Sequence, residues 1–157
     1  MKKMVSRITF VLFLLAGCAQ PSRFAPSYAD AHVGTPDADK AVLVLYRKTV
    51  PPLIYTVTSQ VNDKEFASLP NNAFSWSYLT PGDYEIKMKW PLLALTPGKT
   101  INLNIEAGKY YFVEFGGDTH IAGVGGVVYS THDITLNNYE QGILAVQNCC
   151  KYVPSRL

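Results

Sequence analysis

The residue types in this chain that could do chemistry are three histidines, three cysteines and a few acids in apolar segments. Asp118, His120, His132 and Asp133 flank a glycine-rich segment, and they could converge if that segment folds back as a hairpin. Two imidazoles and two carboxylates are ligands that zinc and similar divalent metals accept. Their spacing does not require such a site, so we expect no metal and no other cofactor. His32 lies in a polar segment and is expected to be solvated.

No set of catalytic residues emerges from the remaining polar side chains. A nucleophilic triad needs a serine or cysteine beside a base and an orienting acid. The serines lie mostly on predicted strand faces, and no Gly-x-Ser-x-Gly motif occurs. Glu114 is unusual because it lies in the apolar run 110–115. It either points outward or pairs with a lysine, or it is a buried carboxylate with a raised pKa. We therefore expect a protein that is not an enzyme, with no catalytic residues.

Cys149 and Cys150 are adjacent in the sequence. Neighbouring Cα atoms lie about 3.8 Å apart, which is shorter than the roughly 4.4–6.8 Å that disulfides prefer. A disulfide between them is therefore possible only in a strained ring, and the alternatives are two free thiols or a bridge to another chain. The pair lacks the two-residue spacer of a redox-active Cys-x-x-Cys motif.

The N-terminus reads as a targeting segment. Lys2, Lys3 and Arg7 precede a run from residue 8 to residue 16 that is apolar apart from Thr9. This run is long enough for the core of a signal peptide and too short to span a bilayer as a helix. It ends in Leu-Ala-Gly followed by Cys18.

A signal peptide that ends in small residues and then a cysteine resembles the lipobox of bacterial lipoproteins. The resemblance implies that diacylglycerol is attached to the thiol of Cys18, that the chain is cut between Gly17 and Cys18, and that the new amine is acylated. Several acyl chains together give stable membrane anchoring. The residue after the cysteine is Ala19 and not an aspartate. This resembles the sorting signal that sends a lipoprotein to the outer membrane, where it would face the periplasm.

The chain then divides into a signal peptide (1–17), a lipidated flexible tether (18–40) and a folded domain (41–157). The tether is rich in Pro, Ala, Ser and Asp, and its random-coil reach is about 25 Å. Losing the signal peptide lowers the basic residues from 14 to 11 against 12 acidic residues. The mature chain therefore lacks the basic footprint of a nucleic-acid-binding protein.

From residue 41 the pattern predicts short strands separated by turns. The run 41–46 is apolar throughout and predicts a strand buried on both faces. Alternation predicts strands over 73–79 and 83–90, which place Trp76 and Trp90 on inward faces. Turns are predicted at Asn62-Asp63 and at Pro81-Gly82. The other predicted strands cover residues 53–60, 65–69, 100–106, 110–115 and 127–129.

The last part of the domain changes its period. Leu136, Tyr139, Ile143 and Val146 are spaced three or four residues apart, which predicts a short amphipathic helix near 134–147 capped by Asp133. The predicted fold is therefore all-β: an antiparallel β-sandwich of seven or eight strands with one short C-terminal helix.

Four motifs resemble a bacterial lipoprotein-associated domain family of unknown function. They are VLVLYRK at 42–48, the Asn62-Asp63 turn, the segment from Leu79 to Tyr84 and the segment from Ala107 to Tyr111. The resemblance covers about 41–148 and implies a transthyretin-like sandwich. The family has no established catalytic residues to transfer to this chain.

These observations predict a membrane-anchored envelope lipoprotein that acts as a non-enzymatic scaffold or protein-interaction module. Its partners would be the membrane, through the lipid, and an envelope protein. The candidate partner surfaces are the apolar loop with Leu92, Leu93 and Leu95 and the glycine-rich segment 121–126. One alternative is a binder of a sugar or peptidoglycan fragment through exposed Trp76 and Trp90. A second alternative is an envelope hydrolase built on the histidine and aspartate cluster.

Overall fold

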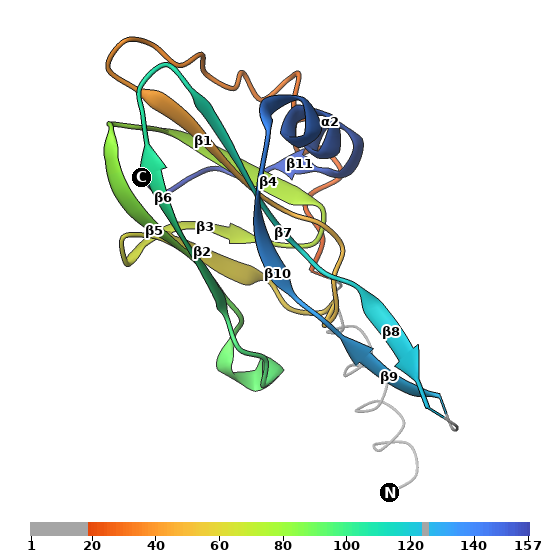
Figure 1. The fold of residues 1–157 in the computed structure, drawn as a ribbon. Coiled ribbons are helices and arrows are strands. Elements are labelled where there is room, and N and C mark those ends of the chain that lie inside the picture. The colour runs from red at the N-terminus through yellow and green to blue at the C-terminus, as the bar shows by residue number, and fades with distance from the viewer. Residues whose placement is uncertain (1–18, 124–125) are drawn as a thin grey trace, which may run out of the picture.

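The computed structural model describes residues 19–123 and 126–157, and this part of the chain is mostly β with a single α-helix (Figure 1). Eleven strands form a five-stranded sheet, a four-stranded sheet and a two-stranded hairpin. The five-stranded sheet has the order β10 (Asp133–Asn137), β7 (Tyr110–Gly116), β1 (Ala41–Arg47), β4 (Ala73–Leu79) and β11 (Lys151–Tyr152). The four-stranded sheet has the order β3 (Lys64–Leu69), β2 (Val57–Val61), β5 (Gly82–Lys89) and β6 (Lys99–Ile105). The hairpin consists of β8 (Thr119–Ala122) and β9 (Val127–Ser130), and the helices are the 3₁₀-helix η1 (Leu92–Ala94) and α2 (Tyr139–Cys149).

The two larger sheets share one hydrophobic core. Leu43 and Leu45 of β1 lie in this core together with Phe66 of β3, Ile86 of β5 and Phe115 of β7. Alternate residues of β5 and β6 point into the core, as the sequence pattern predicts, because successive side chains of a strand point to opposite faces.

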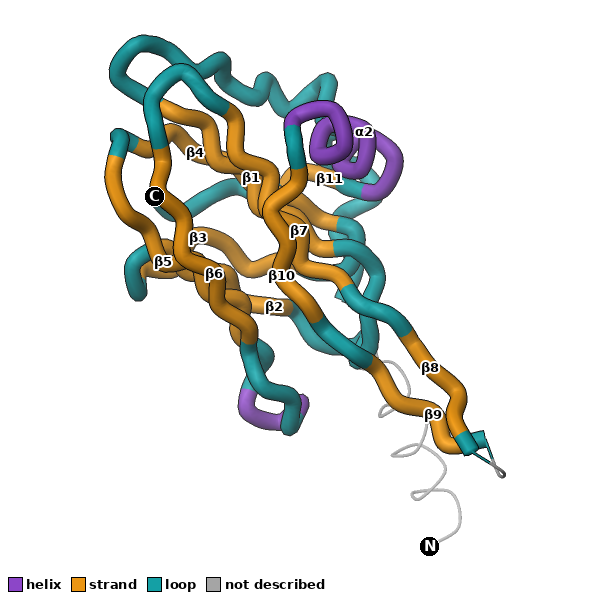
Figure 2. The backbone as a smooth tube through the Cα atoms, in the orientation of Figure 1, coloured by secondary structure: helices purple, strands orange, loops and turns teal. Residues whose placement is uncertain are grey.

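The helix α2 covers the opposite face of the five-stranded sheet. Figure 2 shows the helix lying against this sheet. Val42, Val44 and Tyr46 of β1 pack there against Val146 of the helix. Every residue of β1 is therefore buried, which confirms the prediction of a strand covered on both faces. Gly142 permits the close approach of helix and sheet, because a Cβ atom there would lie 2.3 Å from Cβ of Phe112.

The all-β prediction is confirmed in its coarse form, whereas several details differ. The sheets contain eleven strands where seven or eight are predicted. The pairing is not purely antiparallel, because β1 pairs in parallel with β7 and β4 pairs in parallel with β11. The predicted turn at Asn62-Asp63 is present, and both residues have the positive φ angles (48° and 62°) that a tight hairpin turn requires.

The predicted helix near 134–147 is wrong at its beginning. Residues 133–137 form β10, which pairs with β7, and the helix runs from Tyr139 to Cys149. Asn138 caps the helix by accepting a hydrogen bond from the backbone N–H of Gln141, so Asp133 is not the cap. Leu136 has the spacing of a helix residue by coincidence, because the free edge of β7 offers residues 133–137 a strand partner.

Part of the segment predicted as a tether lies on the domain. Tyr28, Ala31 and Val33 pack against the buried side chains between α2 and the five-stranded sheet. We call these side chains the α2-side cluster: Val42, Val44, Tyr46, Phe74, Phe112, Val146 and Cys150. The backbone N–H of Tyr152 donates to the carbonyl of Pro26, and the hydroxyl of Tyr110 donates to the carbonyl of Gly34. Composition favours a solvated linker here, but the sheet face leaves apolar area that these few side chains cover. Among residues 19–123 and 126–157, no helix has both the length and the apolar character needed to cross a bilayer.

Candidate functional site

Several connections meet at one end of the domain because of how the strands pair. The parallel pairing of β1 and β7 sets Arg47 beside Phe115, so both strands end on the same side. The end of β5 lies there too, since Lys89 pairs with Thr58 at the start of β2. Figure 1 shows η1 and the β8–β9 hairpin projecting at this end. We call residues 49–56, 90–98, 119–122 and 127–130 the apolar end.

The leucines predicted as a partner surface lie on this end and are exposed. The exposed fractions are 89% for Leu92, 79% for Leu93 and 90% for Leu95. Pro91 precedes η1 in an extended conformation, and Leu95 ends it with a positive φ of 50°, so the short turn projects from the sheet. Among the described residues, seven of the thirteen exposed large hydrophobic side chains lie on the apolar end: Leu53, Ile54, Leu92, Leu93, Leu95, Ile121 and Tyr129.

An open cleft of about 580 Å³ lies between the loops of the apolar end. Its wall is formed by Pro51 and Pro52 from the β1–β2 loop, by residues 94–97 and Lys99, and by residues 130–132 before β10. This lining is rich in proline and aliphatic groups with a few hydroxyls. The cleft therefore offers apolar contact with little fixed charge.

Arg47 holds the loop that forms one wall of this cleft. Its side chain is fully buried, and its guanidinium donates to the carbonyls of Tyr55 (2.7 Å), Leu69 (3.0 Å) and Val50 (3.2 Å). The guanidinium also lies over the ring of Trp90, with 4.8 Å from Cζ to the ring centroid. Burial lowers the pKa of Arg47 to about 10. Sequence reasoning did not assign this role, although an arginine that ends a strand buried on both faces is a signal for it.

The histidines and aspartates considered as metal ligands from the sequence do not converge. The ring of His132 lies 5.2 Å from the ring of Trp90, and its Nε2 contacts the carbonyl oxygen of Pro51. His120 stacks on Tyr129 of the β8–β9 hairpin, with 5.1 Å between ring centroids. Within residues 19–123 and 126–157, no three His, Cys, Asp or Glu side chains group as metal ligands would.

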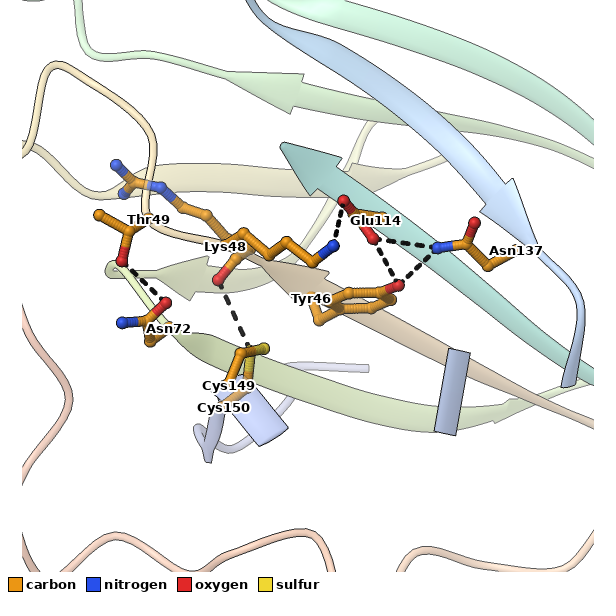
Figure 3. The surroundings of a disulfide bond; sticks show 9 residues. Tyr46, Lys48, Thr49, Asn72, Glu114, Asn137, Cys149 and Cys150 are labelled. Atoms are coloured by element: carbon orange, nitrogen blue, oxygen red, sulfur yellow. Dashed lines mark hydrogen bonds and ion pairs between the residues drawn. A yellow bond between two sulfur atoms is a disulfide. The ribbon is translucent and has the colours of Figure 1, made fainter. Parts of the chain in front are cut away.

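A hydrogen-bonded cluster surrounds Glu114 (Figure 3). The hydroxyl of Tyr46 donates to Glu114 Oε2 (2.8 Å), and Asn137 Nδ2 donates to the same oxygen (3.0 Å). Lys48 Nζ lies 2.9 Å from Oε1. Glu114 therefore pairs with a lysine, the first of the two roles considered from the sequence. Burial and the adjacent carboxylate raise the pKa of Tyr46 above its ordinary value.

The adjacent cysteines form a disulfide, the strained ring that was one of three alternatives (Figure 3). The disulfide lies at the C-terminus of α2, and Cys150 Sγ lies 3.7 Å from the carbonyl oxygen of Arg47. Cys18, the predicted lipidation site, lies outside the described residues.

The two tryptophans lie on opposite faces of the five-stranded sheet, where the sequence pattern places them on one. Trp90 is 8% exposed and belongs to the core between the sheets, whereas Trp76 is half-buried against the α2-side cluster. Ser75, which neighbours Trp76 and lies on the other face of β4, is also buried, because both faces of this strand are covered.

Residues 37–127 match a protein family described as a protein of unknown function (DUF2846). The chain belongs to this family. The DUF2846 region begins before β1 and ends at the start of β9, so it includes η1 and the loop with Leu92, Leu93 and Leu95. The strand β10, the helix α2 and the disulfide follow it. No curated protein and no solved structure shows significant similarity to the chain.

Proposed function

We propose that this DUF2846 protein is a lipid-anchored, non-enzymatic interaction module of the cell envelope, held at the outer membrane and facing the periplasm. The basic and then apolar N-terminus that leads to Cys18 supports the anchor. The domain that follows is one body with a shared core, and residues 26–34 add to it. In this proposal the lipid supplies location, and the surface of the domain supplies contacts.

The exposure of Leu92, Leu93 and Leu95 carries the proposal of an interaction surface. Three neighbouring leucines at 79–90% exposure are costly in water, and contiguous exposed apolar groups are typical of interaction sites. They lie beside the 580 Å³ cleft, so a partner would find both a projecting and a hollow feature.

The packing of the aromatic and titratable side chains favours this proposal over the two alternatives. Trp90 is enclosed by Arg47 and Phe115, which removes it as a stacking platform for a sugar. The rings of His120 and His132 are engaged by different neighbours, which argues against a shared hydrolytic site.

We further propose that eight of the strands form the transthyretin-like sandwich implied by the sequence motifs. The four-stranded sheet β3-β2-β5-β6 and the strands β10-β7-β1-β4 of the five-stranded sheet supply four strands to each layer. The strand β11 and the β8–β9 hairpin are then additions to this core.

Metabolic labelling with an alkyne fatty acid tests the anchor. The wild-type protein should be labelled and the Cys18→Ser variant should not, because thioether formation needs the thiol. A Cys149→Ser/Cys150→Ser variant is the matched control and should be labelled like the wild type. Equal labelling of wild type and Cys18→Ser would refute the anchor.

A photo-crosslinking amino acid at position 93, irradiated in intact cell envelopes, tests the interaction surface. The matched position is Leu144, an exposed leucine on α2. Adducts that form at 93 and not at 144 would support the proposal. Equal adduct yields at the two positions would contradict it.

A further inference from the structure

The loops of the apolar end lie in three of the sequence segments that contain no Asp, Glu, Lys or Arg: residues 49–62, 90–98 and 119–132. Together they include all of the apolar end. The turns at the other end of the same strands are charged. They carry Asp37, Asp39, Lys40, Asp63, Lys64, Asp83, Glu106 and Lys109. The exposed aliphatic groups are therefore gathered in uncharged loops at one end of the strands. Charged residues border these loops at Lys48, Lys89, Lys99 and Asp118, and Lys99 lines the cleft.

The first described residue is fixed at the apolar end. The backbone N–H of Asn71 donates to the carbonyl of Ala19 (2.9 Å), and Asn71 Nδ2 contacts the same oxygen (3.3 Å). Asn71 is buried, and its Nδ2 also donates to the carbonyl of Leu53, one of the exposed apolar residues (2.7 Å). Ala19 is thus held next to the loop that contributes Leu53 and Ile54.

This contact determines how far the domain can lie from its anchor. Cys18 directly precedes Ala19, and consecutive Cα atoms are about 3.8 Å apart. Because the 19–40 segment lies on the domain, the anchor point is one residue from the apolar end. A solvated tether would instead permit about 25 Å of separation between the anchor and the domain. An anchor so close gives these loops a high effective concentration at the lipid surface.

We propose that the apolar end is a membrane-contacting surface and that its partner is the bilayer to which Cys18 is anchored. This inference rests on the proposed function, because it needs the lipid at Cys18. The exposed side chains of Leu92, Leu93 and Ile121 enter the boundary between headgroups and acyl chains, where burial of apolar area is favourable. No ionised side chain of the three uncharged segments has to be desolvated, and Tyr129 has the amphipathic ring that this boundary favours.

With the apolar end on the bilayer, the two ends of the domain have different roles. The charged turns at residues 62–64, 82–83 and 106–109 point away from the bilayer. They are then the part of the domain that an envelope protein partner would meet. The loop with Leu92, Leu93 and Leu95 remains an interaction surface in this arrangement, but its partner is lipid in place of an envelope protein.

Depth-dependent quenching in vesicles tests the inference on the full lipidated protein. A Leu93→Cys variant is labelled with an environment-sensitive fluorophore and reconstituted into phosphatidylethanolamine–phosphatidylglycerol vesicles. Leu144→Cys is the matched control, because it also replaces an exposed leucine. We expect the probe at 93 to shift to the blue and to be quenched by phospholipids with spin-labelled acyl chains. The probe at 144 should show neither change.

A second labelled variant, Ile121→Cys, should behave like Leu93→Cys, because the two positions lie on different loops of the same end. Vesicle flotation and the mass of the Cys18 peptide report the anchor independently. If the protein is lipidated and floats, but the probe at 93 is unquenched, the inference is wrong and the proposed function stands. If Cys18 carries no lipid, the proposed function fails and this inference fails with it. A crosslink from position 93 to protein and not to lipid in intact envelopes would also overturn the inference.

Discussion

Replacing Arg47 by methionine should destabilise the domain and release the β1–β2 loop. Arg47 is fully buried and carries no carboxylate partner among its contacts. Its two terminal nitrogens donate to the backbone carbonyls of Val50, Tyr55 and Leu69, whereas its buried Nε has no hydrogen-bond partner. Methionine has a similar length and no hydrogen-bond donor, so the change removes the three bonds without leaving a large cavity. Two of the three carbonyls belong to the loop that carries Leu53 and Ile54.

The size of the effect follows from two opposing contributions. Hydrogen bonds from a charged donor contribute about 1.5–3 kcal/mol each, and all three would be lost. Methionine also removes the cost of burying the charge. Burial lowers the pKa of Arg47 to about 10, and at roughly 1.36 kcal/mol per pKa unit that cost is on the order of 3 kcal/mol. The net expectation is a loss of about 1–6 kcal/mol, a large share of the roughly 5–15 kcal/mol that stabilises a typical domain.

Lysine at position 47 gives a sharper test of the same reasoning. It retains the buried charge, but its single nitrogen cannot reach the acceptors that the two terminal nitrogens of arginine contact. We therefore expect Arg47→Lys to be less stable than Arg47→Met, although it is the more conservative substitution.

Urea unfolding of residues 18–157 with Cys18→Ser measures these differences in stability. Tryptophan fluorescence and far-ultraviolet circular dichroism monitor the unfolding. Trp90 reports directly, because the guanidinium lies 4.8 Å from its ring. Arg156→Met is the matched control. Arg156 is exposed in an ion pair with Glu65, and its loss should change stability by about 1 kcal/mol or less. A methionine variant as stable as the wild type, or a lysine variant more stable than the methionine variant, would refute the argument.

Three further predictions concern other parts of the domain. Burial raises the pKa of Tyr28 to about 12, so the unfolded chain ionises first and stability should fall as pH rises from about 10 to about 12. Because Tyr28 is only half-buried and solvent screens part of the effect, we expect a fall on the order of 1 kcal/mol. Urea midpoints of Tyr28→Phe should fall less over this range. Gly142→Ala normally favours a helix by about 1 kcal/mol, but the new Cβ would lie 2.3 Å from Phe112, so urea unfolding should show a loss of about 1–3 kcal/mol. Zinc should leave the melting temperature unchanged, because His120 and His132 are engaged separately. A stabilisation that His120→Ala and His132→Ala both abolish would contradict this.

The features that sequence reasoning predicted well are those set by local rules. The alternation in β5 places Ile86 and Met88 in the core, and the same rule holds for Leu103 and Ile105 in β6. The turn at Asn62-Asp63 follows from residues that adopt positive φ at low cost. In each case a few neighbouring residues contain the necessary information.

The features that it missed depend on a partner that is distant in the sequence. Residues 133–137 have a helical spacing, yet they pair with β7 because that strand has a free edge. The segment around Tyr28 reads as a linker until the face of the five-stranded sheet is available to cover. His120 and His132 are close in sequence, but the β8–β9 hairpin carries one away while the aromatic side chains of Trp90 and Phe115 hold the other.

The polarity of the domain shows how topology turns weak sequence signals into one surface. Uncharged loops are common singly, and scattered exposed leucines need no explanation. Here β1 pairs in parallel with β7, and β5 pairs antiparallel with β2. Three such loops therefore lie at the same end of the domain. An apolar surface of this kind on a free domain would promote aggregation. The hydrogen bonds between Asn71 and Ala19 put the same surface next to the residue that follows Cys18. In our proposal the lipid and the exposed leucines account for each other, since an anchor on the preceding residue would keep this end against a bilayer.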